Sequence, residues 1–145
     1  MKASLLDVSV LIALFWMGHP SNGKALEWFG RHASAGWATC PHTQAAFVRI
    51  VSNPSFSKSA ATVEEATRLL AENLDHPKHE FWPADIDYFT AIRPFANRIV
   101  GHQQVSDAYL LGLAIHRRGN LVTMDRGMLE LVPAKIRQSG LVTLI

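Results

Sequence analysis

Three aspartates stand at positions where their side chains could act together in catalysis. Asp7 comes where a short apolar stretch stops, and Asp125 repeats this arrangement after the apolar stretch Leu121–Met124. Asp107 lies near the start of a segment whose apolar residues have helical spacing. In a sheet whose strands alternate with helices, strand ends and helix starts meet at the same edge. The spacing therefore lets all three carboxylates converge.

Carboxylates that converge repel one another unless a cation compensates their charge. A set of oxygen ligands suits Mg²⁺ or Mn²⁺, which keep several waters and are held by a few carboxylates together with substrate phosphates. Such an ion activates water and stabilises the charge of a phosphodiester during hydrolysis. A second interpretation stays open, in which each aspartate only caps a helix, as Asp7 could do for the apolar segment that follows it.

Five short segments have the composition of strands that would carry these acids. Most are rich in Leu, Val, Thr or Trp, and several are bounded by Gly or Pro, which end regular structure. We predict strands at Ser4–Leu6, Trp37–Cys40, Glu80–Trp82, Leu121–Met124 and Leu141–Leu144.

Helical patterns fill the gaps between these strands. Thr62 followed by Glu65 predicts a capping box at a helix start. Asp85 is expected to cap a helix over Tyr88–Phe95, and Gln104–Arg118 has apolar residues at helical spacing. Short strands that alternate with helices predict an α/β fold, with a central parallel sheet covered by helices on both faces.

Length and composition bound the class of protein. The 145 residues fit a single domain over 1–145, and 48% are apolar, which is enough to cover both faces of a sheet. Charged residues make up 18%, below the ~25% of an average soluble protein, so we expect a partner or a second copy to cover apolar surface. A net charge of +2 excludes a general nucleic-acid binder, which carries a dense basic stripe.

Cysteine content and hydropathy suggest where the protein works. Cys40 is the single cysteine and cannot form an internal disulfide, which favours a reducing compartment. The first apolar run, Val8–Met17, is shorter than the ~20 residues that span a bilayer. We therefore expect a soluble, cytoplasmic protein with no membrane partner.

Four segments together resemble the motifs of one known family, the PIN-domain ribonucleases of the VapC toxin type. Leu5–Ile12 resembles the opening motif, with an apolar strand, the first acid and a small polar residue two places on. The others are similar to the second, third and fourth motifs in their order and spacing, and are Thr39–Pro54, Ser106–Leu110 and Thr123–Gly127. The match runs from about Leu5 to Val132, almost the whole chain.

This resemblance implies a fold, an activity and partners. The fold is a three-layer α/β/α sandwich around a parallel sheet, and the activity is endonucleolytic cleavage of structured RNA of the tRNA or ribosomal RNA class with one or two Mg²⁺ or Mn²⁺ ions. A cognate antitoxin of a type II toxin–antitoxin system would cover the site with its carboxyl-terminal segment, and the toxin would form homodimers.

The resemblance also assigns roles to residues of this chain. Asp7 and Asp107 would be the main metal ligands, and Asp125 would complete the site directly or through water. Ser9 and Thr123 would orient waters or ligands around them.

One catalytic position departs from the family's pattern. The second motif normally carries Glu where this chain has Gln44. A Gln carbonyl can touch a metal ion, but it brings no negative charge and cannot act as a base. Two functions therefore stay open, a ribonuclease toxin and a catalytically impaired PIN-fold module that binds RNA or antitoxin without cutting.

Two further residues have positions that fit RNA contact, and the pattern of acids argues against other classes of α/β protein. Arg126 directly follows a site acid and His102 precedes the third motif, so both are candidates for RNA contact.

A phosphatase with an aspartyl nucleophile would need Asp-x-Asp after the first strand, whereas this chain has Asp7 and then Ser9. A receiver domain would need a second acid before the first strand ends and a Lys at a strand end, and neither is present.

Overall fold

The sheet is the part of the fold that positions the predicted site. A computed structural model describes residues 2–145. Its five strands are β1 Ser4–Leu6, β2 Trp37–Thr39, β3 His79–Phe81, β4 Asn120–Thr123 and β5 Val142–Leu144. They form one sheet in the order β3-β2-β1-β4-β5, and every neighbouring pair is parallel. All five predicted strands are confirmed, each to within a residue at its ends.

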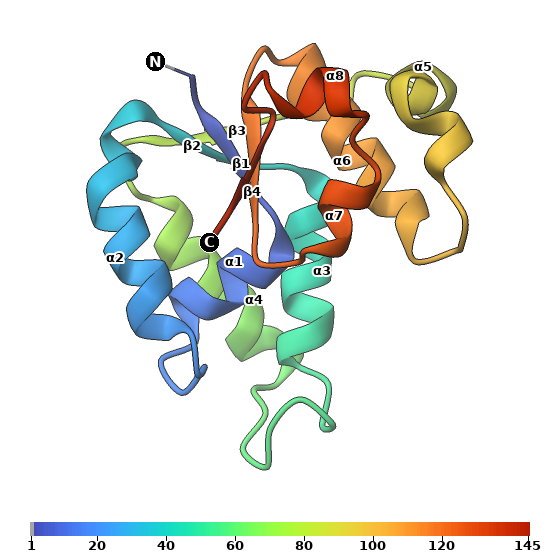
Figure 1. The fold of residues 1–145 in the computed structure, drawn as a ribbon. Coiled ribbons are helices and arrows are strands. Elements are labelled where there is room, and N and C mark those ends of the chain that lie inside the picture. Colours follow the sequence, from blue (N-terminus) through green and yellow to red (C-terminus); the bar gives the residue numbers. More distant parts are fainter. Residues whose placement is uncertain (1) are drawn as a thin grey trace.

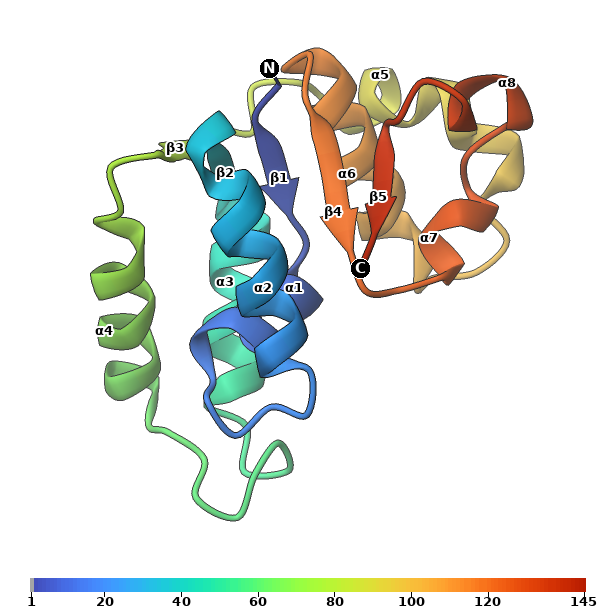
Figure 2. The ribbon, with the colours of Figure 1, turned by 60° about the vertical axis from the view of Figure 1, so that its left-hand side comes forward.

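Helices cover both faces of this sheet, which confirms the predicted three-layer α/β/α architecture. Figures 1 and 2 show α1–α4 gathered on one side of the sheet and α5–α8 on the other. The helices are α1 Val8–Phe15, α2 Asn22–His32, α3 Pro41–Val51, α4 Val63–Leu74, α5 Tyr88–Ile92, α6 Gln104–His116, α7 Gly127–Glu130 and α8 Ala134–Arg137, with 3-10 turns η1 Ala33–Ala35 and η2 Arg93–Arg98. Within residues 2–145, every helix is too short or too polar to cross a bilayer.

Each face of the sheet has its own hydrophobic core. Successive strand residues point to opposite faces. In β1, Leu5 therefore packs with Phe95 and Leu110 on the α5–α6 side, and Leu6 packs with Phe47 on the α1–α4 side. Both leucines are fully buried, and burying a leucine side chain contributes about 1.5–3 kcal/mol. This double packing fixes the register of β1, and with it the position of the residue that follows.

The register of β1 against β4 sets the site. Leu6 pairs with Val122, so the next residues of the two strands, Asp7 and Thr123, lie side by side. The Asp7 backbone N–H donates to the Val122 carbonyl at 2.9 Å, which extends the ladder by one step. The carboxyl ends of parallel strands therefore bring these two side chains together.

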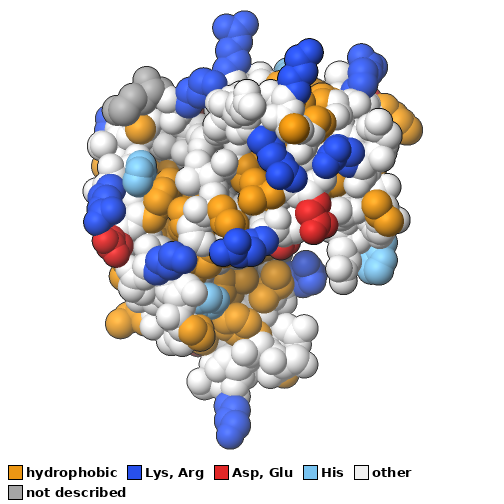
Figure 3. All heavy atoms as spheres, viewed as in Figure 1, with side chains coloured by type: hydrophobic (Ala, Val, Ile, Leu, Met, Phe, Trp, Pro, Cys, Tyr) orange, Lys and Arg blue, Asp and Glu red, His pale blue; other side chains and the backbone are white. Residues whose placement is uncertain are grey.

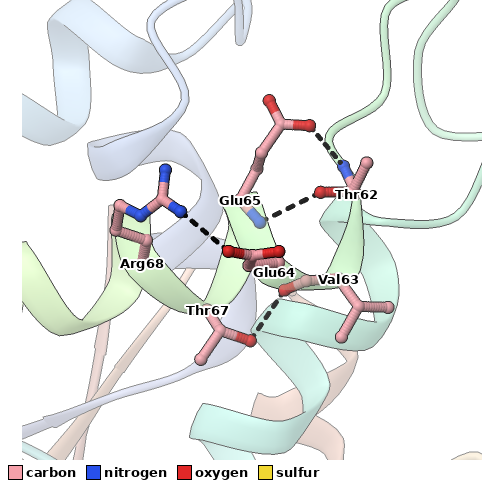
Figure 4. A network of polar contacts seen from close by, with 6 residues as sticks. All are labelled: Thr62, Val63, Glu64, Glu65, Thr67 and Arg68. Carbon is pink, nitrogen blue, oxygen red and sulfur yellow. Dashed lines mark hydrogen bonds and ion pairs between the residues drawn. The ribbon is translucent and has the colours of Figure 1, made fainter.

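The predicted capping box at the start of α4 is confirmed. Figure 4 shows Thr62 Oγ1 accepting from the Glu65 N–H at 3.1 Å, while the Glu65 carboxylate accepts from the Thr62 N–H at 3.2 Å. Hydrogen bonding of the Glu65 carboxylate to the Thr62 backbone and side chain lowers the pKa of Glu65. Arg68 and Glu64 add an exposed ion pair one turn apart, a type of contact that contributes ~0.3–0.5 kcal/mol.

The expected cap of α5 is wrong in position. Asp87, directly before the helix, is the cap, and its carboxylate accepts from the Thr90 N–H at 3.1 Å. Asp85 instead pairs with Arg117 at 2.8 Å, and with His116 at 3.2 Å, at the end of α6. A capping side chain reaches only two or three residues ahead, so Asp85 stands too far from the helix start.

Candidate active site

Asp7 lies where β1 becomes α1, and its carboxylate is held by three donors. The backbone N–H of Val8 donates to Oδ1 at 2.8 Å, and the Thr123 hydroxyl donates to Oδ2 at 2.7 Å. The Ser9 hydroxyl lies 3.4 Å from the same Oδ2. Asp7 does cap α1, as one interpretation held, but it also faces the neighbouring strand. These bonds fix the orientation of a side chain that is only 6% exposed.

Asp107 is half-buried in the first turn of α6. Burial raises the pKa of its carboxyl to about 6, and the charges of Asp7 and Asp125 contribute to the rise. Burial also raises the pKa of Asp7, with a smaller contribution from Asp125. The structure brings the three predicted acids to one edge of the sheet, because Asp7 and Asp125 share the Thr123 hydroxyl and Asp107 and Asp125 line one pocket.

Asp125 is more exposed than the other two and follows the end of β4. Its backbone N–H donates to Thr123 Oγ1 at 3.0 Å, and its Oδ1 accepts from the Gly127 N–H at 2.9 Å. Gly127 lies close enough that a Cβ there would stand 3.1 Å from that Oδ1. The turn from β4 to α7 thus holds Asp125 through the backbone.

The carboxylate oxygens of the three aspartates are ligands that suit Mg²⁺ or Mn²⁺, although the three side chains do not surround a single point. Within residues 2–145, no three His, Cys, Asp or Glu side chains are grouped closely enough to hold a metal ion as they stand. Both Asp7 oxygens and Asp125 Oδ1 are taken up by hydrogen bonds instead. The set is nevertheless all oxygen and mutually repelling, which is the environment that these hard cations match.

The side chain of Gln44, in the first turn of α3, is hydrogen-bonded to β2 and not to the three acids. Its Nε2 donates to Thr39 Oγ1 at 3.0 Å, and that fully buried hydroxyl lies 2.8 Å from His79 Nε2. Thr39 is on the same face of β2 as Trp37, which packs in the core on the α1–α4 side. Among residues 2–145, no hydrogen bond joins Gln44 to the three acids. The predicted catalytic position therefore faces the β2–β3 edge.

His79 completes a polar chain that begins at Gln44. Burial lowers the pKa of His79, which favours the neutral imidazole. Because the Gln44 amide donates to Thr39, the Thr39 hydroxyl is free to donate to an unprotonated His79 Nε2. Gln44 thus fits its surroundings as a donor, a role that an ionised Glu could not fill.

A pocket of about 370 Å³ opens beside the acids. His102 lines it, whereas Arg126 lies exposed outside the lining, and the RNA contact predicted for both residues stays a prediction. The lining residues are Gly101, His102, Gln103, Gln104, Asp107, Asp125, Gly127 and Glu130. The pocket thus extends from two of the acids toward α7 and the loop before α6.

Comparison with known proteins decides the family. The PIN domain family matches residues 4–133. Ribonuclease VapC38 of Mycobacterium tuberculosis is 41% identical over 128 residues, which cover 88% of this chain and 89% of that protein. Ribonuclease VapC44 of the same organism is 37% identical over 136 residues, covering 93% and 95%.

The chain belongs to the PIN-domain family, among the VapC-type proteins. A solved structure has the same fold as this PIN domain. It is the crystal structure of VapBC2 from Rickettsia felis bound to a DNA fragment from their promoter, with a TM-score of 0.62. It covers 99% of this chain and 97% of its own, and at 15% identity the likeness concerns the fold alone.

Two residues at the site of this PIN domain were not predicted from its sequence. Gln104 Oε1 accepts from the backbone N–H groups of Val100 and Gly101, at 2.7 and 3.3 Å, and so holds the loop before α6. Glu130 lines the pocket from α7. Only the place of Glu130, five residues after Asp125 and one helical turn into the following segment, could have suggested it from the sequence.

Proposed function

We propose that this chain is an endoribonuclease toxin that hydrolyses RNA phosphodiester bonds with the help of Mg²⁺ or Mn²⁺. The observation that carries the proposal is that Asp7 and Asp125 share the Thr123 hydroxyl, while Asp125 and Asp107 line one pocket at the same edge of the sheet. Relatives called ribonucleases, at 37–41% identity over most of the chain, support the same activity.

Each acid has the role that the family resemblance implies for its position. Asp7 and Asp107 would be the main ligands of the ion, with Asp125 touching it directly or through water. When bound, Mg²⁺ or Mn²⁺ supplies the positive charge that activates water and stabilises the phosphodiester. Thr123 and Ser9 would keep Asp7 oriented, because both hydroxyls lie against its Oδ2.

RNA and an antitoxin are the proposed partners. The substrate would be structured RNA of the tRNA or ribosomal RNA class, contacted in part by His102 in the pocket and Arg126 at its edge. A cognate antitoxin would neutralise the toxin in the cytoplasm, and two copies of the chain would form a homodimer. Figure 3 supports a covering partner, because hydrophobic side chains gather on the face that carries α1 and α2.

Gln44 favours a second candidate, a PIN-fold module that binds RNA or antitoxin with little cleavage. Where the family's second motif has an acid, this chain has an amide that donates to Thr39. The missing charge would weaken cation binding. The three remaining carboxylates still supply most of the negative charge of the site, so we place the nuclease first.

The experiment is cleavage of total bacterial RNA by the wild-type chain and by Gln44→Glu, each with Mg²⁺, Mn²⁺ or EDTA. Discrete fragments that need a metal ion support the nuclease, and stronger cleavage by the variant would mark the wild type as impaired at one acid. Asp107→Asn serves as the inactive control. If neither protein cuts while both bind RNA, the enzyme is excluded and the binding module remains.

A further inference from the structure

Glu130 is a solvent-exposed acid that lines the pocket beside the three acids. It lines the pocket from the last residue of α7. Within residues 2–145, no hydrogen bond or ion pair reaches this carboxylate. The nearby Arg98 does not pair with it but donates from Nε to the backbone carbonyl of Glu130 at 2.9 Å. Arg98 therefore holds the backbone of α7 in place and leaves the acidic side chain free.

Glu130 is not a fourth member of the acid group. Thr123 links Asp7 and Asp125 through hydrogen bonds, whereas Glu130 belongs to a different element, as the last residue of α7. Glu130 lines the pocket from α7, whereas Asp107 lines it from the first turn of α6 and Asp125 from the segment after β4. Figure 3 shows acidic side-chain atoms at the surface over α7, with Lys or Arg side chains close by. A substrate that reaches Asp107 and Asp125 through this pocket would also meet Glu130.

A free carboxylate in an RNA-binding pocket restricts what can lie against it. An ionised Glu accepts hydrogen bonds only, and it repels phosphate groups. Its favourable partners in RNA are the N–H groups at the edges of unstacked bases, which proteins read directly in single-stranded regions. The position of Glu130 thus points to a nucleobase and not to the sugar–phosphate backbone.

Among the four bases, guanine matches a carboxylate best. Its Watson–Crick edge presents N1–H and the N2 amino group side by side, so two donors meet two acceptor oxygens. Adenine and cytosine each place a bare ring nitrogen beside their amino group, and uracil flanks its one N–H with two carbonyls. An ionised carboxylate would repel each of these neighbouring acceptors.

We propose that this pocket binds a guanine base of the RNA next to the scissile phosphodiester, with Glu130 accepting from its N1–H and N2 amino groups. The proposal rests on the proposed nuclease function and names a specificity residue for it. The pocket volume of about 370 Å³ falls in the range of small-molecule sites, ~300–1,000 Å³. His102 offers a flat ring for stacking, and Gln104 holds the loop that carries His102.

A double-mutant cycle between protein and RNA tests this contact. The probes are fluorescein-labelled nine-nucleotide RNAs of uridine with one central guanosine or inosine. Inosine lacks only the N2 amino group. Binding to wild type and Glu130→Gln is measured by anisotropy with Ca²⁺, a cation of looser geometry than Mg²⁺. Wild type is expected to prefer guanosine by about tenfold, within the range for one bidentate base contact, and Glu130→Gln is expected to lose that preference.

The control is Glu72→Gln, which removes the same charge from an exposed position on α4, on the other side of the sheet. This variant should keep the guanosine preference. If wild type does not prefer guanosine, or if Glu130→Gln keeps the preference, the proposal is overturned. Equal thermal melting curves for the three proteins verify that a lost preference does not come from unfolding.

Cleavage with Mn²⁺, measured on the same proteins, separates this proposal from the proposed function. Cleavage without coupling between Glu130 and the N2 amino group rejects the guanine pocket alone. Coupling without any cleavage rejects the nuclease and retains the pocket. Where cleavage occurs, sequencing of the fragment ends should show guanine beside the cut with wild type and a relaxed base choice with Glu130→Gln.

Discussion

The Thr123 hydroxyl donates a 2.7 Å hydrogen bond to Asp7 Oδ2, and this bond joins the carboxyl ends of β4 and β1. The Thr123 hydroxyl oxygen also accepts from the Asp125 backbone N–H at 3.0 Å. One fully buried hydroxyl therefore positions two of the three acids. Its place follows from the strand register, in which Leu6 pairs with Val122 and the next residue of each strand carries a polar side chain.

Replacing Thr123 should damage the site and the fold together. Thr123→Val keeps the shape of the side chain but leaves Asp7 Oδ2 and the Asp125 N–H without this partner. We expect a loss of about 1–3 kcal/mol in the free energy of unfolding, because buried polar groups lose their bond. Metal affinity should fall by about 10–100-fold, as for other residues that orient ligands. Denaturant unfolding and Mn²⁺ titration measure the two effects. Thr123→Ser, which retains the hydroxyl, should behave nearly as wild type.

The raised pKa of Asp107 predicts how stability depends on pH without metal. Its pKa is about 6 in the folded protein and 3.8 ordinarily, so between these values the folded state holds more protons than the unfolded state. This group's contribution to stability is complete below pH 3.8 and is lost as pH rises through 6. Asp107→Asn should therefore stabilise the protein by about 1 kcal/mol at pH 8 in EDTA, a value discounted for the screening of a half-buried group.

The measurement is thermal unfolding of wild type and Asp107→Asn at pH 4 and pH 8 in EDTA. The variant should gain stability over wild type at pH 8 and little at pH 4. Equal stability differences at the two pH values would contradict the coupling of Asp107 to burial and to the other acids. Asp75→Asn, at an exposed position after α4, is the control for removing one charge.

Gln44→Glu should change the protonation of a distant histidine. A Glu carboxylate cannot donate to Thr39, so the Thr39 hydroxyl would donate to it, and His79 Nε2 would have to donate to Thr39 in turn. His79 also bonds to the Leu74 backbone, a contact that raises its pKa, so with Nε2 donating as well the imidazolium is favoured and the pKa of His79 should rise above its value in wild type. An NMR titration of the His79 ring measures it. An unchanged pKa in Gln44→Glu would contradict this order of donors and acceptors. The control is Gln138→Glu, at an exposed position after α8, which should leave the pKa of His79 unchanged.

Gly112 allows α5 to approach α6. A Cβ at this position would stand 2.1 Å from the backbone oxygen of Ala91, which cannot move without displacing α5. Gly112→Ala should lower the free energy of unfolding by about 1–3 kcal/mol through overpacking. Gly30→Ala, in the interior of α2 with open space around it, should instead stabilise by about 0.5–1 kcal/mol. Unfolding curves that rank the two variants in the opposite order would contradict this packing.

The sequence predicted the sheet well because its strands are short apolar segments between polar ones. The same pattern placed Asp7, Asp107 and Asp125 at one edge, since parallel strands and the helices that follow them leave little choice of position. The capping box at Thr62 was also predictable, because it depends on residues three apart in the chain. Patterns among residues close together in the sequence therefore predicted most of the fold.

Contacts between distant segments could not be predicted in this way. Aspartate is a common capping residue, so the sequence suggested that Asp85 caps a helix. Only the fold shows that its partner is Arg117, 32 residues away. The hydrogen bond of Gln44 to Thr39 and the place of Glu130 in the pocket depend likewise on side-chain directions. Spacing along the chain does not specify these directions, so the details of substrate binding required the structure.

The most direct test of the three-acid site is calorimetric titration of Mn²⁺ into wild type, Asp7→Asn, Asp107→Asn and Asp125→Asn at pH 7.5, with Asp85→Asn as the control outside the site. We predict that wild type and the control bind Mn²⁺ alike, that Asp7→Asn and Asp107→Asn lose most of the affinity, and that Asp125→Asn loses less. Equal binding by all five proteins, or no binding by wild type, would contradict the account.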